Sequence, residues 1–293
     1  MTNSRRDFLK NAIFAAAGMA VLPQWLNATE KKGKAVGIQL YTLKDVINNN
    51  VKEVIENVAK AGYGEVESYG YVPKGKFWGL TPVEFKALLD QHGLKAPSGH
   101  YDFENYIETG NLDSIKAYID VAKTLDSKYI TAPWLATKLR KNADDYKAIA
   151  EKLNTAGELA KKSGLAIAYH NHDFEFKTFD GKTGLELLLN QTDPKLVSFE
   201  LDLYWAEHAQ NHPLDLFVKY PGRFKMWHVK DMNKLNRNDN TEVGNGTIDF
   251  KPIFKKAAAS GMEHFFVEQE NNYAPTIYDS IKTSCTYIKS KLI

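Results

Sequence analysis

The chain has 293 residues, of which 43% are hydrophobic and 25% are charged, and its formal net charge is +2. This composition is typical of a soluble globular protein. No basic cluster follows the first ten residues, which argues against nucleic acid or an anionic membrane surface as a partner. A single cysteine, Cys285, excludes a disulfide within the chain and a lipoprotein anchor near the N-terminus.

The N-terminus has the features of an export signal. Arg5 and Arg6, with phenylalanine and leucine behind them, match the twin-arginine motif, and a short apolar run follows over residues 12–22. That run is too short to span a bilayer as a mature helix, so no stable membrane insertion is expected. An amphipathic N-terminal helix is the alternative. We expect residues 1–30 to be a cleaved signal, the twin-arginine export machinery to be a partner, and the mature protein to be periplasmic.

Short apolar runs then alternate with longer amphipathic runs along the chain. The apolar runs are typical of buried parallel strands and the amphipathic ones of helices, several of which end at a glycine. The expected strands begin near residues 36, 65, 95, 128, 165, 197, 225 and 264, and the clearest expected helices span 51–61, 82–92, 113–125 and 144–162.

Successive strands start 28 to 39 residues apart, which leaves room for one strand, one helix and two loops in each unit. Eight such units in about 260 residues predict an α/β fold, a single (βα)8 TIM barrel over residues 31–293. A doubly wound open sheet is the rival. It would normally carry a glycine-rich phosphate turn after its first strand, and the sequence at 39–42 is not one. No break in composition divides the range, so one domain is expected.

Polar residues gather at the carboxyl ends of the predicted strands, which meet at one mouth of such a barrel. A random surface distribution would not choose that end on nearly every strand. Because side chains two residues apart share a face of a strand, the members of each close pair are expected to point the same way. The residues concerned are Glu67, His100, His170, His172, Glu200, Asp202, His228, Lys230, Glu268 and Glu270.

Imidazole and carboxylate groups on successive strands suit one divalent metal ion. Mixed nitrogen and oxygen ligands favour Mn, Zn, Co or Fe over Ca, with Mg also open. Each residue alone has a structural alternative: a lone histidine is more often a hydrogen-bonded structural residue, Glu67 could cap a loop, and Lys230 could form a local ion pair. These alternatives would all have to select the same end of the barrel independently, which favours a site.

Four motifs carry a resemblance to a known family. They are Glu-Leu-Asp-Leu-Tyr-Trp (200–205), Trp-His-Val-Lys-Asp (227–231), Gly-Asn-Gly-Thr-Ile-Asp-Phe (244–250) and Phe-Val-Glu-Gln-Glu (266–270). In this order they resemble the xylose isomerase-like barrel superfamily, which contains sugar phosphate isomerases and epimerases, inosose dehydratases and endonuclease IV. The resemblance implies a metal held by ligands on the last four strands. Carried over by motif, these are Asp202, His228 and Glu268, with His170 where relatives carry a glutamate.

The histidine at position 170 bears on the reaction that the resemblance implies. Epimerases of this type use two metal-bound glutamates on opposite faces of the substrate, and here only Glu268 is such a glutamate. The missing partner could be His172, Lys230 or Glu175. Alternatively one face suffices, as in inosose dehydratases, which remove a proton beside a ketone and expel a neighbouring hydroxyl. A glycoside with a ketone at C3 could lose its aglycone in the same way.

Roles follow from the resemblance and the strand ends together. Glu268 is expected to be the catalytic base, with His172 or Lys230 as donor to the oxyanion or leaving group. The expected substrate is a small-molecule carbohydrate. Its contacts would be Glu67, His100, Trp134, Glu175, Glu200, Tyr204 and Glu270, with Tyr204 and Trp205 as stacking platforms.

The preferred function is a metal-dependent sugar isomerase or epimerase. A lyase or hydrolase that eliminates water or an aglycone from a keto sugar is the alternative, and a periplasmic sugar-binding barrel without catalysis is the third. Sugar phosphates are mainly cytoplasmic, so an exported enzyme would meet free sugars or glycosides. Endonuclease activity is disfavoured, because loss of the signal leaves 35 basic and 34 acidic residues and no basic DNA face. The sequence leaves oligomerisation open.

Overall fold

Eight parallel strands close into a barrel in the computed structural model, which describes residues 34–72 and 75–293. The first strand pairs with the last, so the sheet has no free edge. The predicted (βα)8 barrel is confirmed, and every predicted strand start lies within one residue of an observed one. Around the barrel the strands are β1 (Gly37–Gln39), β2 (Glu65–Ser68), β3 (Lys95–His100), β4 (Tyr129–Ala132), β5 (Ala166–His170), β8 (Val197–Asp202), β9 (Phe224–Val229) and β12 (His264–Val267).

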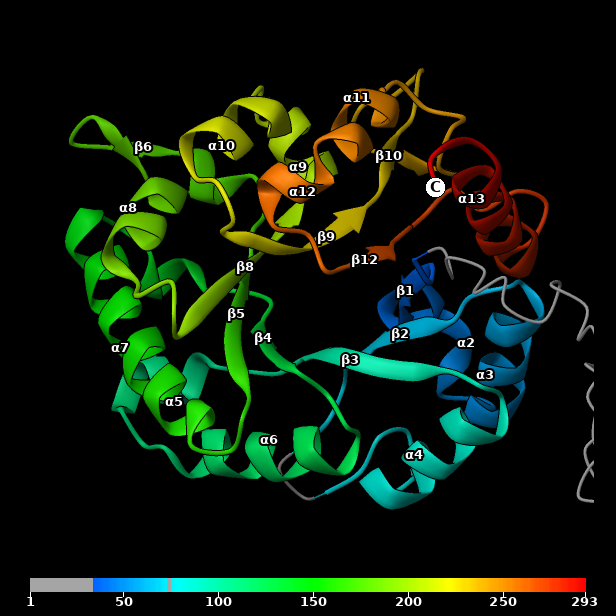
Figure 1. Ribbon diagram of the computed structural model, residues 1–293, viewed down its shortest axis with the longest axis horizontal. Coiled ribbons are helices and arrows are strands. Elements are labelled where there is room, and N and C mark those ends of the chain that lie inside the picture. Colours follow the sequence, from blue (N-terminus) through cyan, green and yellow to red (C-terminus); the bar gives the residue numbers. More distant parts are fainter. Residues whose placement is uncertain (1–33, 73–74) are drawn as a thin grey trace, which may run out of the picture. The chain divides into compact units, whose positions relative to one another are not determined.

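Helices surround the barrel, and the last helix lies beside α3 (Figure 1). None of the helices in the described ranges is long and apolar enough to cross a membrane. The expected export signal lies outside the described residues. The helices are α2 (Lys44–Ile47), α3 (Val51–Lys60), α4 (Pro82–Gln91), α5 (Glu104–Thr109), α6 (Asp113–Thr124), α7 (Ala143–Lys161), α8 (Gly184–Gln191), α9 (Leu203–His208), α10 (Pro213–Lys219), α11 (Phe250–Lys255), α12 (Ala257–Ser260) and α13 (Ile277–Lys291).

Local side chains fix where the helices begin. At the start of α4, the Thr81 hydroxyl accepts a hydrogen bond from the Glu84 backbone N–H, and the Glu84 carboxylate accepts one from the Thr81 N–H. This reciprocal capping satisfies amide groups that have no partner inside the helix. At the start of α7, the Asn142 side chain accepts hydrogen bonds from the backbone N–H groups of Asp144 and Asp145. The four predicted helices are observed as α3, α4, α6 and α7, each within one residue at both ends.

The barrel interior is apolar in the middle and becomes polar towards the carboxyl ends of the strands. Tyr129, Ala168, Met226 and Phe266, from β4, β5, β9 and β12, form a buried cluster of their own, separate from the main core. Residues two positions further along a strand point the same way. The next layer on these strands is therefore polar, and it consists of Thr131, His170, His228 and Glu268. The site predicted at the strand ends thus rests on a packed apolar floor.

The segment after β9 is held by one carboxylate. The two Asp231 oxygens accept hydrogen bonds from the backbone N–H groups of Met232, Gly244, Gly246 and Ile248. A β-carbon at Gly246 would lie 2.2 Å from Asp231 Oδ1, so this close approach requires glycine. The Gly-Asn-Gly motif therefore folds around Asp231, and β10 (Asp231–Met232) pairs with β11 (Asn240–Thr241).

We expect Asp231→Asn to lower the free energy of unfolding by about 1–3 kcal/mol, because an amide NH2 would face backbone N–H donors that need an acceptor. Urea denaturation measures this change. Asp215→Asn is the matched control at an exposed position, with an expected change within about 0.5 kcal/mol. Equal effects of the two substitutions would contradict the anchoring role of Asp231.

Candidate active site

A cleft of about 720 Å³ lies over the polar layer. Its volume is within the range of about 300–1,000 Å³ that is usual for small-molecule sites. It includes seven of the residues predicted for the site, together with loop residues that the sequence did not single out. The lining residues are Tyr41, Tyr69, Gly70, Tyr71, His100, Tyr101, Asp102, Glu104, Pro133, Trp134, His170, His172, Trp205, Glu268 and Glu270.

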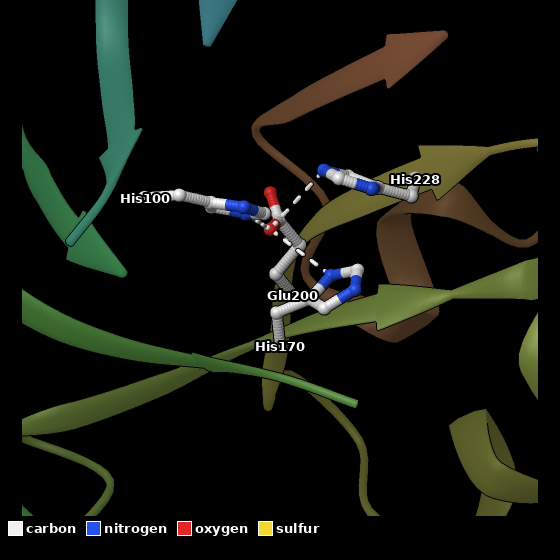
Figure 2. Close-up of side chains that lie close together, drawn as sticks. All are labelled: His100, His170, Glu200 and His228. Atoms are coloured by element: carbon white, nitrogen blue, oxygen red, sulfur yellow. Dashed lines mark hydrogen bonds and ion pairs between the residues drawn. The ribbon is translucent and has the colours of Figure 1, made fainter. Parts of the chain in front are cut away.

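Two buried glutamates lie among three imidazoles beneath the cleft. Glu200 Oε2 is 2.8 Å from His100 Nε2, 3.3 Å from His170 Nδ1 and 3.3 Å from His228 Nε2 (Figure 2). Glu67 Oε2 is 2.7 Å from His228 Nε2 and 3.1 Å from His100 Nε2. His170 Nδ1 makes no hydrogen bond in spite of its distance, because the geometry is unfavourable. Five groups that can carry charge therefore share a small buried volume.

A second group of possible metal ligands shares His228 with the first. The ligand atoms of Asp202, His228 and Glu268 lie within 4.8 Å of one another, as do those of His100, His170, Glu200 and His228. His228 Nδ1 is 3.1 Å from Glu268 Oε2. One oxygen of Asp202 caps α9, and the other is buried with no partner.

Lys230 lies below the cleft and neutralises two of its acids. It is 1% exposed, its Nζ is 3.3 Å from Glu268 Oε2, and it forms a close ion pair with Glu270. The ammonium also lies 5.3 Å from the ring centres of both Tyr204 and Trp205. Lys230 therefore acts on the cleft through the carboxylates that it contacts.

Burial and neighbouring charge set the protonation of the histidines. Burial alone would lower the pKa of His100, but the carboxylates of Glu67 and Glu200 raise that pKa to about 9. Burial, with help from Lys230, lowers the pKa of His172 to about 3. At neutral pH the cleft therefore presents a protonated imidazole at His100 and a neutral one at His172.

The carboxyl groups are affected in opposite directions. Burial and the charge of Glu67 raise the pKa of Glu200 to about 7, and burial raises the pKa of Asp202 to about 6. Burial would raise the pKa of Glu268 as well, but the ammonium of Lys230 holds it well below its usual value. Glu268 is thus an ionised carboxylate on the wall of the cleft.

The residues present fit a divalent cation. Buried polar atoms in native proteins nearly always have a partner, yet His170 Nδ1, Glu200 Oε1 and Asp202 Oδ2 have none. All three belong to the two groups described above. Imidazole nitrogen with carboxylate oxygen is a ligand set for Zn, Mn, Co or Fe. A cation among these atoms would satisfy them and offset the surplus of carboxylates.

The structure corrects several of the predicted roles. Glu67 and Glu200 are fully buried under the histidines and do not line the cleft. Glu175 is also buried, where it accepts hydrogen bonds from the Tyr169 hydroxyl and the His172 backbone N–H. These carboxylates make contacts inside the protein and are not placed to contact a substrate.

Tyr204 is the clearest error of prediction. Its ring is packed against Trp205 and His208, and its hydroxyl donates to the Arg237 carbonyl oxygen, so no face is free for a sugar. The helix α9 begins directly after Asp202, and this turns Tyr204 away from the mouth. Trp205, Trp134, His172, His100 and Glu270 do line the cleft.

The predicted metal ligands divide between the two groups. Asp202, His228 and Glu268 converge as expected, whereas His170 belongs with His100 and Glu200, joined to the others through His228. The tyrosines and acids in the loops after β1, β2 and β3 were missed. The only signal for them was their position shortly after a strand end.

Comparison with known proteins gives the family. Residues 55–290 match the xylose isomerase-like TIM barrel family model. The chain belongs to this family. Inosose dehydratases from Clostridium botulinum and Clostridium beijerinckii are 25% and 29% identical to it over 280 and 259 residues, which cover 83% and 77% of this chain and 90% and 80% of theirs.

Solved structures agree with this membership of the xylose isomerase-like family. A sugar phosphate isomerase/epimerase from Parabacteroides distasonis has a TM-score of 0.79 and 30% identity, and the match covers 90% of this chain and 96% of that one. An IolI protein with a bound zinc atom has a TM-score of 0.69 at 19% identity, covering 88% and 99%, which is a likeness of fold. This barrel therefore belongs to an enzyme family whose named relatives act as sugar isomerases, epimerases or dehydratases.

We expect the purified protein to bind about one equivalent of a divalent ion, and Asp202→Asn to weaken that binding by at least the 10- to 100-fold typical of residues that merely support ligands. Metal analysis and calorimetric titration with Mn²⁺, Zn²⁺ and Co²⁺ measure this. His212→Ala removes an exposed histidine and should leave the affinity unchanged. A wild-type protein that binds none of these ions would contradict the assignment of the cluster.

Proposed function

We propose that this barrel is a divalent-metal-dependent enzyme that removes the proton beside a carbonyl of an uncharged carbohydrate and expels the neighbouring oxygen substituent. One observation supports elimination above all. Among the described residues, Glu268 is the one carboxylate that both lines the cleft and belongs to a group of possible metal ligands. The histidines that line the cleft beside it are His100, His170 and His172. One base facing imidazoles suits one-sided proton removal better than the two opposed carboxylates of an epimerase.

The charge of the cleft favours an uncharged substrate. Four carboxylates line it, and no lysine or arginine does among the residues that the structure describes. Phosphate is normally held by arginine, lysine or a helix N-terminus. Two of the four acids are paired with Lys230, but the described lining offers a phosphate no lysine or arginine and keeps two further carboxylates, Asp102 and Glu104, near it. A neutral sugar derivative fits the lining, even though the similar Parabacteroides protein is named for sugar phosphates.

The metal would be held by Asp202, His228 and Glu268, with His170 or Glu200 completing the set. Bound there, it would supply Lewis-acid stabilisation of the negative charge that develops on a substrate oxygen. The chain's own groups keep the site ready for this charge. Lys230 holds Glu268 ionised, and the apolar floor excludes water from below.

Proton transfer can be assigned to atoms of this chain. The Glu268 carboxylate takes the proton from the carbon next to the carbonyl, and the electron pair left behind enters the carbonyl as an enolate. Collapse of the enolate forms a carbon–carbon double bond and breaks the bond to the oxygen on the following carbon. That oxygen needs a proton as it leaves. His100 can supply it, because it lines the cleft and its contacts with Glu67 and Glu200 are made through Nε2.

Isomerisation is the second candidate. The same base could return the proton to the adjacent carbon with no loss of a substituent. The 30% identity to the Parabacteroides isomerase/epimerase favours it, whereas the sequence relatives named inosose dehydratase favour elimination. The two reactions differ in whether the molecular formula of the carbohydrate changes.

We expect Glu268→Gln to reduce turnover of a keto sugar by about 10²–10⁴-fold, the usual contribution of a general base. Reactions in deuterated water followed by mass spectrometry and by absorbance of the enone measure both rate and product. Glu263→Gln is the matched control, since Glu263 lies at the other end of the same strand. Bound metal is measured for each variant.

The product decides between the two candidates. Loss of water or of a larger substituent, with an enone left behind, supports elimination. Deuterium on carbon with an unchanged formula would replace our proposal with isomerisation. Full activity of Glu268→Gln with metal bound would remove Glu268 as the base in either case.

We also propose that the enzyme works in the periplasm, on the strength of the paired arginines at positions 5 and 6 and the apolar run behind them. Export fits a cleft for uncharged carbohydrates, because phosphorylated sugars are mainly cytoplasmic. The twin-arginine machinery would be the partner in this step.

We expect replacement of both Arg5 and Arg6 by lysine to keep the protein in the cytoplasm, because lysine lacks the planar guanidinium. Cell fractionation followed by immunoblotting measures the distribution. Lys10→Arg, which keeps the pair and the charge, should leave export unchanged. Normal periplasmic recovery of the double variant would show that the pair is not the signal.

A further inference from the structure

One wall of the cleft is an exposed indole that is fixed in place. Trp134 is 44% exposed although it lines the cleft. Its ring meets those of His172 and Phe174 edge-on, at centroid distances of 5.1 and 5.0 Å. The Arg140 guanidinium lies 3.4 Å from the centre of the Phe174 ring and 5.6 Å from that of Trp134. These contacts hold the indole, and the exposed part of its surface lines the cleft.

The ring of His172 lies between Trp134 and the catalytic groups. The His170 and His172 rings are 5.0 Å apart, and Trp134 is a further 5.1 Å step from His172. A sugar ring above His170 and Glu268 would therefore leave Trp134 beside whatever is attached to that ring. Trp205, 5.7 Å from His172, extends the same aromatic surface.

The size of the cleft agrees with two rings. Sites of about 300–1,000 Å³ enclose ligands of drug size, and a single hexose is smaller than such a ligand. At about 720 Å³ the cleft has space beyond the reacting sugar. Aromatic side chains give a large contact area at a low cost in conformational entropy, and an immobilised one costs still less.

We propose that Trp134 forms a subsite for a second ring, so that the substrate is a glycoside and the group expelled is a ring-bearing alcohol. This inference rests on the proposed elimination. A glycoside with a ketone at C3 loses its C2 proton to Glu268, and the enolate electrons form the C1–C2 double bond. The C1–oxygen bond breaks, and the aglycone oxygen leaves with a proton. No oxidant or reductant is consumed. The second ring is either an aryl group or another sugar.

Binding of unreactive glucosides to the metal-loaded protein tests the subsite apart from the reaction. We expect phenyl glucoside or a glucose disaccharide to bind about 3- to 10-fold more tightly than methyl glucoside of the same anomer, as measured by calorimetry. Trp134→Ala should abolish this advantage, so that the ring-bearing and methyl glucosides bind with similar affinity. Trp134→Phe, which keeps a ring, should retain most of it.

The outcomes separate the two parts of the inference. Preference for the phenyl compound identifies an aryl leaving group, and preference for the disaccharide identifies a sugar. Equal or unmeasurable binding of the ring-bearing and methyl glucosides overturns the subsite, as does an advantage that survives in Trp134→Ala. Because these probes carry no ketone, failure of the elimination assay leaves a ring preference intact, and the two proposals fail separately.

Discussion

The contacts of His228 are the constraint on which the site depends. Its Nε2 lies 2.7 Å from Glu67 and 3.3 Å from Glu200, while its Nδ1 lies 3.1 Å from Glu268. Two ring nitrogens cannot fully satisfy three carboxylates inside a protein, where an unpaired charge is costly. Asp202 adds a fourth buried acid nearby. The carboxylates at this point therefore carry more negative charge than the histidines and Lys230 neutralise. A divalent cation would balance the remaining charge.

The barrel around the site keeps this surplus of charge away from water, which makes a compensating cation more favourable. The side chains of β4, β5, β9 and β12 form an apolar floor directly below, so the acids cannot draw water from that direction. Above them, aromatic side chains narrow the approach from solvent. The reacting groups thus lie between a dry floor and an aromatic mouth, which is the setting in which fixed charges have their largest effect on a developing oxyanion.

The sequence predicted the barrel well because its strands are short, regularly spaced and buried on both sides. The same regularity located His100, His170, His228 and Glu268, since alternation within a strand carries over to the end of that strand. The prediction of side-chain positions was wrong just beyond the strand ends. Tyr204 follows Asp202, which caps α9, and the immediate helix turns the tyrosine away; Glu175 lies in a 3-10 turn and folds back onto Tyr169. Where a chain turns after a strand depends on contacts from distant segments.

Two neighbouring residues, Lys230 between β9 and β10 and Asp231 at the start of β10, connect stability with chemistry. Lys230 points to Glu268 and Glu270, whereas the next residue, Asp231, points to the backbone of the Gly-Asn-Gly segment. Because the two residues are adjacent in the chain, the hydrogen bonds of Asp231 restrain the backbone from which Lys230 reaches the two carboxylates. A loop that holds no catalytic group therefore supports the backbone of the residue whose charge keeps the base ionised. The motif that looked like a family marker in the sequence is, in physical terms, the support of Lys230.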